Sequence, residues 1–166
     1  MPTILDVSDL RQCANVVLSN IDKYFPEYSY YFHTLNLTGC RPLEPLKIDL
    51  WSFKTNGDIQ LNPLKHNNPR IFNPNSLPSD FVNYLISNNL PFNDARLRTL
   101  LRTFHKMNSY GRLSLFNDGS ALYLFRYLKA KEMYDSGLGV SDVHNYFGWK
   151  NPGLANRYIE KVIYLT

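Results

Sequence analysis

The sequence YLFRYLKAKEMYDSGLGVSDVHNYFGWKNPGLANRY, residues 123–158, carries the strongest signals for fold and function in this chain. A helical pattern over 118–137 ends at Gly137, and two shorter helical patterns follow over 141–148 and 153–165. Glycines lie between these segments, as is common where one helix ends and the next begins. This part of the chain is therefore predicted to form three consecutive helices.

Three side chains in this stretch could together form a functional site. Arg126 lies in the long helix, Trp149 follows it by 23 positions, and Tyr158 follows Trp149 by 9. A guanidinium that holds an anion, an aromatic N–H donor and a hydroxyl nucleophile suit a phosphodiester better than a neutral substrate. Each also has an ordinary alternative, since helical arginines are commonly surface cations and Trp and Tyr are commonly core residues.

The N-terminal part of the chain is predicted to be helical as well. Residues 6–24 place apolar side chains at helical spacing, with Ser8 as the predicted N-cap and Pro26 as the stop. A second, apolar helix is predicted over 28–37, with Gly39 as its C-terminal residue. These segments leave an arginine, at position 41, at the junction between a helix and a loop.

A small sheet is predicted to follow. The runs 46–53 and 58–64 are short and alternating, and the Asn-Gly pair at 56–57 between them favours a tight hairpin. A third short strand is predicted around 70–72. The fold class is therefore predicted to be α+β and mainly helical, with a small three-stranded antiparallel sheet near the N-terminal third.

Two more helices are predicted between this sheet and the C-terminal stretch. Residues 79–88 have Ser79 as the predicted cap, and residues 93–107 have Asn93. The second helix carries a basic face made of Arg96, Arg98, Arg102 and Lys106. This face is either a solvated helix surface or a set of contacts to a phosphate backbone, and we favour the second interpretation slightly.

Composition limits the class of protein. With 166 residues, 44% hydrophobic and 19% charged, the chain is expected to be one globular domain, and its net charge of +4 weakly favours a polyanionic partner. Cys13 and Cys40 form neither a disulfide framework nor a metal-ligand spacing, and the four histidines are scattered. No apolar run reaches membrane length. An intracellular protein that needs no metal or other cofactor is expected.

Three boxes in the sequence together resemble a known family. TGCRPLEPL at 38–46 resembles the pattern TGxRxxExxxL, with Arg41 and Glu44 in register. YLFR at 123–126 resembles an HxxR box, and FGWKNPGLANRY at 147–158 resembles an LGH…Y box. In this order and at these separations they are similar to the catalytic domain of the tyrosine recombinases of the phage-integrase type.

The resemblance covers about residues 6 to 160 and implies the catalytic fold of that family, whose members cleave and rejoin DNA through a 3′-phosphotyrosyl intermediate. It implies Tyr158 as the nucleophile and Arg41 and Arg126 as ligands of the non-bridging phosphate oxygens. It also implies that Lys65 is the general acid, although Lys54 in the hairpin turn competes for this role. Glu44 is expected to orient the arginines.

Two positions depart from the family pattern. Tyr123 stands where the family usually has His, and a phenol is a poorer proton shuttle than imidazole near neutral pH. Trp149 replaces the usual second His, and its indole N–H is still a donor. Both residues are nevertheless expected to belong to the site, with proton transfer resting on Lys65.

The resemblance also sets expectations for the whole molecule. Residues 1–166 are expected to be a single DNA breaking-rejoining domain without an N-terminal core-binding domain, either a natural minimal protein or an excised fragment. Double-stranded DNA is the expected partner, with a monomer in solution, a possible homo-oligomer on DNA and no membrane. The origin is expected to be a virus or another mobile element. The alternatives are a non-catalytic DNA-binding or replication-accessory protein and a strand relaxer resembling type IB topoisomerases.

Overall fold

The computed structural model of the chain describes residues 3–64, 67–90, 113–114, 123–161 and 163–165. The helices in this part of the chain are α1 (Val7–Tyr24), α2 (Ser29–Thr38), α3 (Ser79–Ser87), α5 (Tyr123–Asp135), α6 (Val140–Phe147) and α7 (Leu154–Glu160). The strands are β1 (Thr3–Leu5), β2 (Trp51–Phe53), β3 (Ile59–Leu61), β4 (Arg70–Phe72), β5 (Leu113–Ser114) and β6 (Ile163–Leu165). The fold is α+β and mostly helical, as predicted.

Helix α1 begins with a reciprocal capping box rather than with the predicted Ser8 cap. The Asp6 side chain accepts a hydrogen bond from the Asp9 N–H at 2.8 Å, and the Asp9 carboxylate accepts one from the Asp6 N–H at 3.4 Å. Two carboxylates at this end also suit the helix dipole, which explains why Asp6 is the cap. One face of the helix is buried, through Leu10, Ala14, Val17, Leu18 and Ile21.

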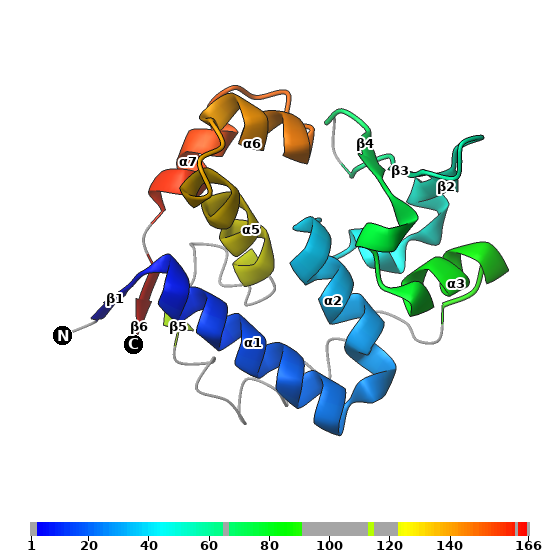
Figure 1. Cartoon of the computed structure of the whole chain (residues 1–166), viewed down its shortest axis with the longest axis horizontal. Helices are drawn as coiled ribbons and strands as arrows, with labels where there is room; N and C mark the ends of the chain where they lie inside the picture. Colours follow the sequence, from blue (N-terminus) through cyan, green and yellow to red (C-terminus); the bar gives the residue numbers. More distant parts are fainter. Residues whose placement is uncertain (1–2, 65–66, 91–112, 115–122, 162, 166) are drawn as a thin grey trace.

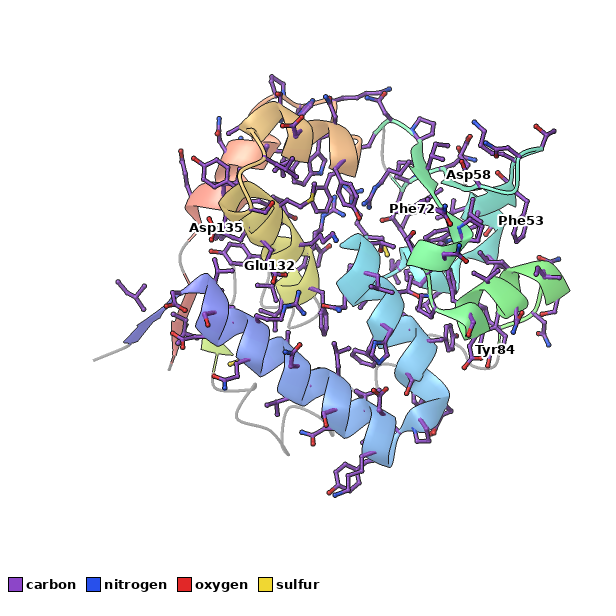
Figure 2. The ribbon with its side chains drawn as sticks, in the orientation of Figure 1. Phe53, Asp58, Phe72, Tyr84, Glu132 and Asp135 are labelled. Atoms are coloured by element: carbon purple, nitrogen blue, oxygen red, sulfur yellow. The ribbon has the colours of Figure 1, made fainter. Side chains whose placement is uncertain are left out.

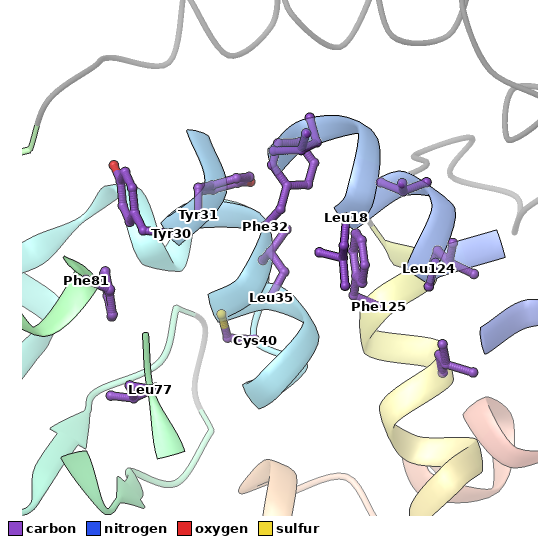
Figure 3. Close-up of a cluster of buried hydrophobic side chains, with 14 of the residues drawn as sticks. Leu18, Tyr30, Tyr31, Phe32, Leu35, Cys40, Leu77, Phe81, Leu124 and Phe125 are labelled. Atoms are coloured by element: carbon purple, nitrogen blue, oxygen red, sulfur yellow. The ribbon is translucent and has the colours of Figure 1, made fainter. Parts of the chain in front are cut away.

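Helix α2 lies at the centre of the molecule and is buried on most sides. Figure 3 shows Phe125 of α5 on one side of it and Phe81 of α3 on the other. Gly39 ends α2, as predicted, with φ of 63°. A β-carbon at Gly39 would lie 2.8 Å from Cε1 of Phe147, so both the left-handed backbone and the close contact require glycine.

Strands β2, β3 and β4 form the predicted three-stranded antiparallel sheet. The hairpin turn falls where the Asn-Gly pair predicts it, with Gly57 at φ of 90°. The first strand is shorter than predicted, because 44–46 and 48–50 form two 3-10 turns instead of extended chain. Pro45 favours the first of these turns, because its fixed φ suits the start of a helical segment.

A second sheet, in the order β1-β6-β5, is absent from the prediction. The predicted helix over 153–165 is wrong in its last part: α7 ends at Glu160, and β6 pairs with both β1 and β5. Figure 1 shows the two ends of the chain side by side at this sheet. Strand pairing with residues far away in the sequence therefore overrides the local helical pattern.

Helices α5, α6 and α7 enclose a second cluster of buried residues next to the main core, consisting of Ala130, Val143, Phe147, Trp149, Ala155 and Ile159. Helix α5 lies within the predicted helix 118–137 and contacts α1, α2 and α7. Figure 1 shows the C-terminal end of α2 between α5 and the β2–β3–β4 sheet. The predicted helix over 93–107 lies outside the described residues.

Candidate anion-binding site

Arg41 lies in the loop that follows α2, and its backbone and side chain are both held. Its N–H donates to Oε1 of Glu44 at 2.6 Å, and its Nη1 donates to the carbonyl of Leu64 at 3.1 Å. The amide oxygen of Asn67, turned toward the guanidinium, accepts from Nη2 at 3.0 Å and from Nη1 at 3.2 Å. The guanidinium therefore contacts both Leu64 and Asn67.

Glu44 connects the loop after α2 with the segment that follows β3. Its side chain is buried, and its second carboxylate oxygen, Oε2, accepts from the N–H of Leu64 at 3.1 Å. The same carboxylate thus holds the backbone of Arg41 and the backbone beside the Arg41 head group. This geometry suits the predicted supporting role of Glu44.

Arg126 projects from α5 into the protein interior and is only 2% exposed. Its Nη1 donates to the carbonyl of Gly39 at 2.7 Å. Its Cζ atom lies 5.0 Å from the ring centroid of Phe147, 5.5 Å from that of Trp149 and 5.8 Å from that of Tyr158. Cation–π attraction to these rings helps to offset the burial of the charge.

The three rings beside Arg126 form a stacked column. The Phe147 and Trp149 rings are 4.5 Å apart with 10° between their planes, and the Trp149 and Tyr158 rings are 5.1 Å apart with 25°. Trp149 is buried and Tyr158 is half-buried. The nine-residue spacing from Trp149 to Tyr158 therefore places the two residues in face-to-face contact across the α6–α7 corner.

The electrostatics connect Arg41 with this column. Burial lowers the pKa of Arg41, and the charge of Arg126 lowers it further, while Glu44, Tyr158 and Tyr123 raise it. Arg126, Tyr123 and Tyr158 are therefore close enough to act on the charge of Arg41, although these residues come from three separate segments. Tyr123 is half-buried at the start of α5.

Several predicted site residues cannot be placed in this cluster. Lys65 and the basic face made of Arg96, Arg98, Arg102 and Lys106 lie outside the described residues. Lys54 is exposed, and its N–H donates to the carbonyl of Asp58 in the hairpin turn. Figure 2 shows Asp58 well away from Asp135 of α5, so the turn that carries Lys54 projects away from α5.

Arg70, which the sequence analysis did not select, is a third buried guanidinium in this region. It is 4% exposed, and its Nε and Nη2 donate to the carbonyls of Tyr146 at 3.0 Å and Thr38 at 2.6 Å. Burial and the nearby charge of Arg126 lower its pKa to about 10. The strand pattern of the sequence contained a signal for this burial. Arg70 and Phe72 are two positions apart on β4 and therefore point to the same, inward face.

The described part of the chain has a further hollow away from the ring column, and the side chains that line it are mostly polar. This open pocket of about 400 Å³ lies beside Arg11, Lys129 and Glu132, at the junction of α1, α2 and α5. Within the described ranges, no three His, Cys, Asp or Glu side chains come together as a metal site. No helix among the described residues is long and apolar enough to cross a lipid bilayer.

Comparisons of the chain with protein-family models, with curated proteins and with solved structures found no match.

Proposed function

We propose that this protein is a DNA strand transferase of the tyrosine recombinase type, which cleaves and rejoins double-stranded DNA through a 3′-phosphotyrosyl intermediate. Its expected setting is the interior of a cell or of a virus-infected host, where it acts as a monomer in solution or as an oligomer assembled on DNA. The recombinase assignment rests on the resemblance of the sequence boxes and on the charge distribution around Tyr158.

Among the described residues, the guanidiniums of Arg41, Arg70 and Arg126 interact with one another and with the carboxylate of Glu44. Arg41 and Arg70 each interact electrostatically with Arg126 and with Glu44. Neither Arg70 nor Arg126 forms an ion pair with a carboxylate among the described residues. Such an excess of buried positive charge is stabilised by an anion, and the half-buried Tyr158 hydroxyl belongs to the same cluster. This charge imbalance is the main support for a phosphodiester substrate.

The proposed reaction needs no external energy source. The Tyr158 hydroxyl loses its proton to water as its oxygen attacks the scissile phosphorus. The bond from phosphorus to the 5′ oxygen breaks, and Lys65 donates a proton to the departing 5′ oxygen. Arg41 and Arg126 bind the non-bridging oxygens, where negative charge increases in the transition state. The free 5′ hydroxyl of the same or another strand then attacks the phosphotyrosine, which restores the DNA backbone and releases Tyr158.

One observation favours a second candidate, a non-catalytic DNA-binding protein. The guanidinium of Arg126 is buried beneath Phe147, Trp149 and Tyr158, and it already donates to the Gly39 carbonyl. Because Arg126 is buried, a phosphate reaches its guanidinium only after side chains that cover it move. In a protein that binds DNA without cleaving it, this closed arrangement would be permanent and Arg126 would serve as a core cation.

A covalent-adduct assay distinguishes the two candidates. The protein is incubated with nicked duplexes of randomised sequence, in which loss of a short 5′ fragment traps the cleaved product, and protein–DNA adducts are resolved on a denaturing gel. We expect an adduct with the wild-type protein and none with Tyr158→Phe. Tyr134→Phe is the matched control, because Tyr134 is an exposed tyrosine on α5.

The result has three informative outcomes. An adduct that Tyr158→Phe abolishes and Tyr134→Phe retains supports the strand transferase. Relaxation of supercoiled plasmid without strand exchange, if it also depends on Tyr158, identifies the relaxing variant of the same chemistry. Measurable DNA binding with no adduct on any substrate contradicts the enzyme and supports the non-catalytic protein.

A further inference from the structure

Arg70 joins the two loops that carry the candidate site. Its Nη2 donates to Thr38, the last residue of α2, and its Nε donates to Tyr146, near the end of α6. The loop after Thr38 supplies Arg41, together with the Gly39 carbonyl that accepts from Arg126. The loop after Tyr146 supplies Trp149. One planar guanidinium thus spans the arginine side and the aromatic side of the site.

The segment before Arg70 reinforces this connection. The N–H of Asn68 donates to the carbonyl of Gly148 at 2.7 Å, directly before Trp149. The Arg70 Cζ atom also lies 4.8 Å from the Tyr146 ring centroid and 5.0 Å from that of Phe147. Strand β4 and the loop before it therefore hold the end of α6 by hydrogen bonds and by aromatic contacts.

The chemistry of Arg70 is unusual for a residue that serves stability alone. Within the described part of the chain, its Nη1 has no hydrogen-bond partner, and the ion pairs join other residues. A buried charge without a carboxylate is costly, and an apolar side chain of similar volume often serves stability better. What an apolar side chain cannot do is donate simultaneously to two carbonyls near the ends of different helices, which is what the fixed fork of arginine allows.

We propose that Arg70 is the positioning residue of this site, which sets the placement of the Trp149–Tyr158 pair relative to Arg41 and Arg126. It does so by holding the carbonyls of Thr38 and Tyr146 at a fixed distance from each other. Arg70 is itself buried and acts through these loops rather than on a phosphate. The part of this inference that concerns catalysis rests on the proposed function, whereas the part that concerns Trp149 does not.

The catalytic part is tested with Arg70→Met and Arg70→Lys in a single-turnover cleavage assay on the trapping duplex. We expect Arg70→Met to lower the rate of adduct formation about a hundredfold, because a misplacement of about 1 Å has an effect of this order, with DNA affinity within about threefold of wild type. Arg70→Lys keeps the charge but reaches only one carbonyl, so it should recover part of the rate.

The structural part is tested by ¹⁹F NMR on protein labelled with 5-fluorotryptophan. The chain has two tryptophans, so two resonances are expected, and Trp51→Phe assigns them. Arg70→Met should shift the Trp149 resonance and leave the Trp51 resonance in place. Arg11→Met is the control, because Arg11 also spans two elements, but its acceptors are the side chains of Glu132 and Asn36 rather than the carbonyls of Thr38 and Tyr146. It should leave the Trp149 resonance and the cleavage rate unchanged.

The two readouts keep this inference separate from the proposed function. If the wild-type protein forms no adduct, the proposed function fails, and a shifted Trp149 resonance in Arg70→Met still supports the positioning role. A folded Arg70→Met variant with an unshifted Trp149 resonance and a wild-type cleavage rate overturns that role. If neither Arg70→Met nor Arg70→Lys folds, Arg70 is a stability residue and the inference is also overturned.

Discussion

Several buried polar side chains of this protein donate to backbone carbonyls. Arg126 donates to Gly39, Tyr31 to Pro42, and Tyr127 to Lys161. Each of these bonds attaches a helix to a loop that has no regular structure of its own. The conformation of the loops therefore depends on single side chains, and replacing one of them should act locally.

Tyr127 provides a test at this scale through pH. Burial, followed by the charge of Asp135, raises the pKa of Tyr127 to about 12. The unfolded chain releases this proton at lower pH than the folded protein, so the stability that Tyr127 contributes is fully present below about pH 10 and is lost between about pH 10 and 12. Tyr127→Phe should therefore lose less stability over this interval than wild type.

Urea unfolding between pH 8 and pH 11 measures this difference. At pH 8 the variant should be about 1 kcal/mol less stable, because the hydrogen bond to the Lys161 carbonyl is missing. Tyr24→Phe, at an exposed tyrosine, controls for the loss of a hydroxyl. Parallel pH profiles for wild type and Tyr127→Phe would contradict the role given to Tyr127.

At the scale of elements, the corner between α6 and α7 determines the position of the stacked rings of Phe147, Trp149 and Tyr158. Gly148 ends α6 with φ of 67°, and its carbonyl accepts from the N–H of Asn68. A β-carbon at Gly148 would lie 2.5 Å from the Asn68 carbonyl oxygen, which belongs to the backbone and cannot rotate away. The corner is therefore built around a contact that only glycine permits.

Gly148→Ala should lower the free energy of unfolding by about 3 kcal/mol, from backbone strain together with overpacking against Asn68. Gly137→Ala is the matched control, because Gly137 has φ of 101° but nothing within 4 Å of its β-carbon position. That variant should lose only about 1 kcal/mol, from strain alone. Thermal unfolding followed by circular dichroism measures both, and equal losses would show that the contact with Asn68 is unimportant.

At the scale of the whole molecule, positive charge is concentrated where three segments meet. The loop after α2, strand β4 and helix α5 contribute Arg41, Arg70 and Arg126, and Glu44 is the carboxylate that acts on both Arg41 and Arg70. Like charges brought together in this way oppose folding, and an anion that binds beside them, at the more accessible Arg41, should relieve the repulsion. Bound anions should therefore stabilise the entire fold.

Sulfate should raise the melting temperature above its value in chloride at equal ionic strength. At tenfold excess over its dissociation constant the gain is about 1.4 kcal/mol, or roughly 3–6 °C for a chain of this size. Arg41→Gln should remove most of this shift, because Arg41 is half-buried and is the most accessible of the three. Arg11→Gln should keep it, because Arg11 is already paired with Glu132. Equal shifts in both variants would rule out a specific site.

The sequence by itself determined the features that depend on a few neighbouring residues. The C-terminal end of α2 at Gly39, the Asn-Gly hairpin and the succession of α5, α6 and α7 follow from local signals and were predicted. The fixed spacings of Arg126, Trp149 and Tyr158 likewise identified side chains that lie together in the structure. Helix periodicity and turn chemistry are encoded locally, which is why they can be read without a structure.

Tertiary structure decided the features that depend on distant partners. The chain after α7 is a strand because β1 and β5, far away in the sequence, pair with it. Arg70 is a buried bridge because its two carbonyl acceptors belong to α2 and α6, 32 and 76 positions away. The burial of Arg126 beneath Tyr158 likewise depends on contact between residues that are far apart in the sequence. Pairing and burial across such separations depend on the packing of the whole chain, and no local pattern of residues encodes them.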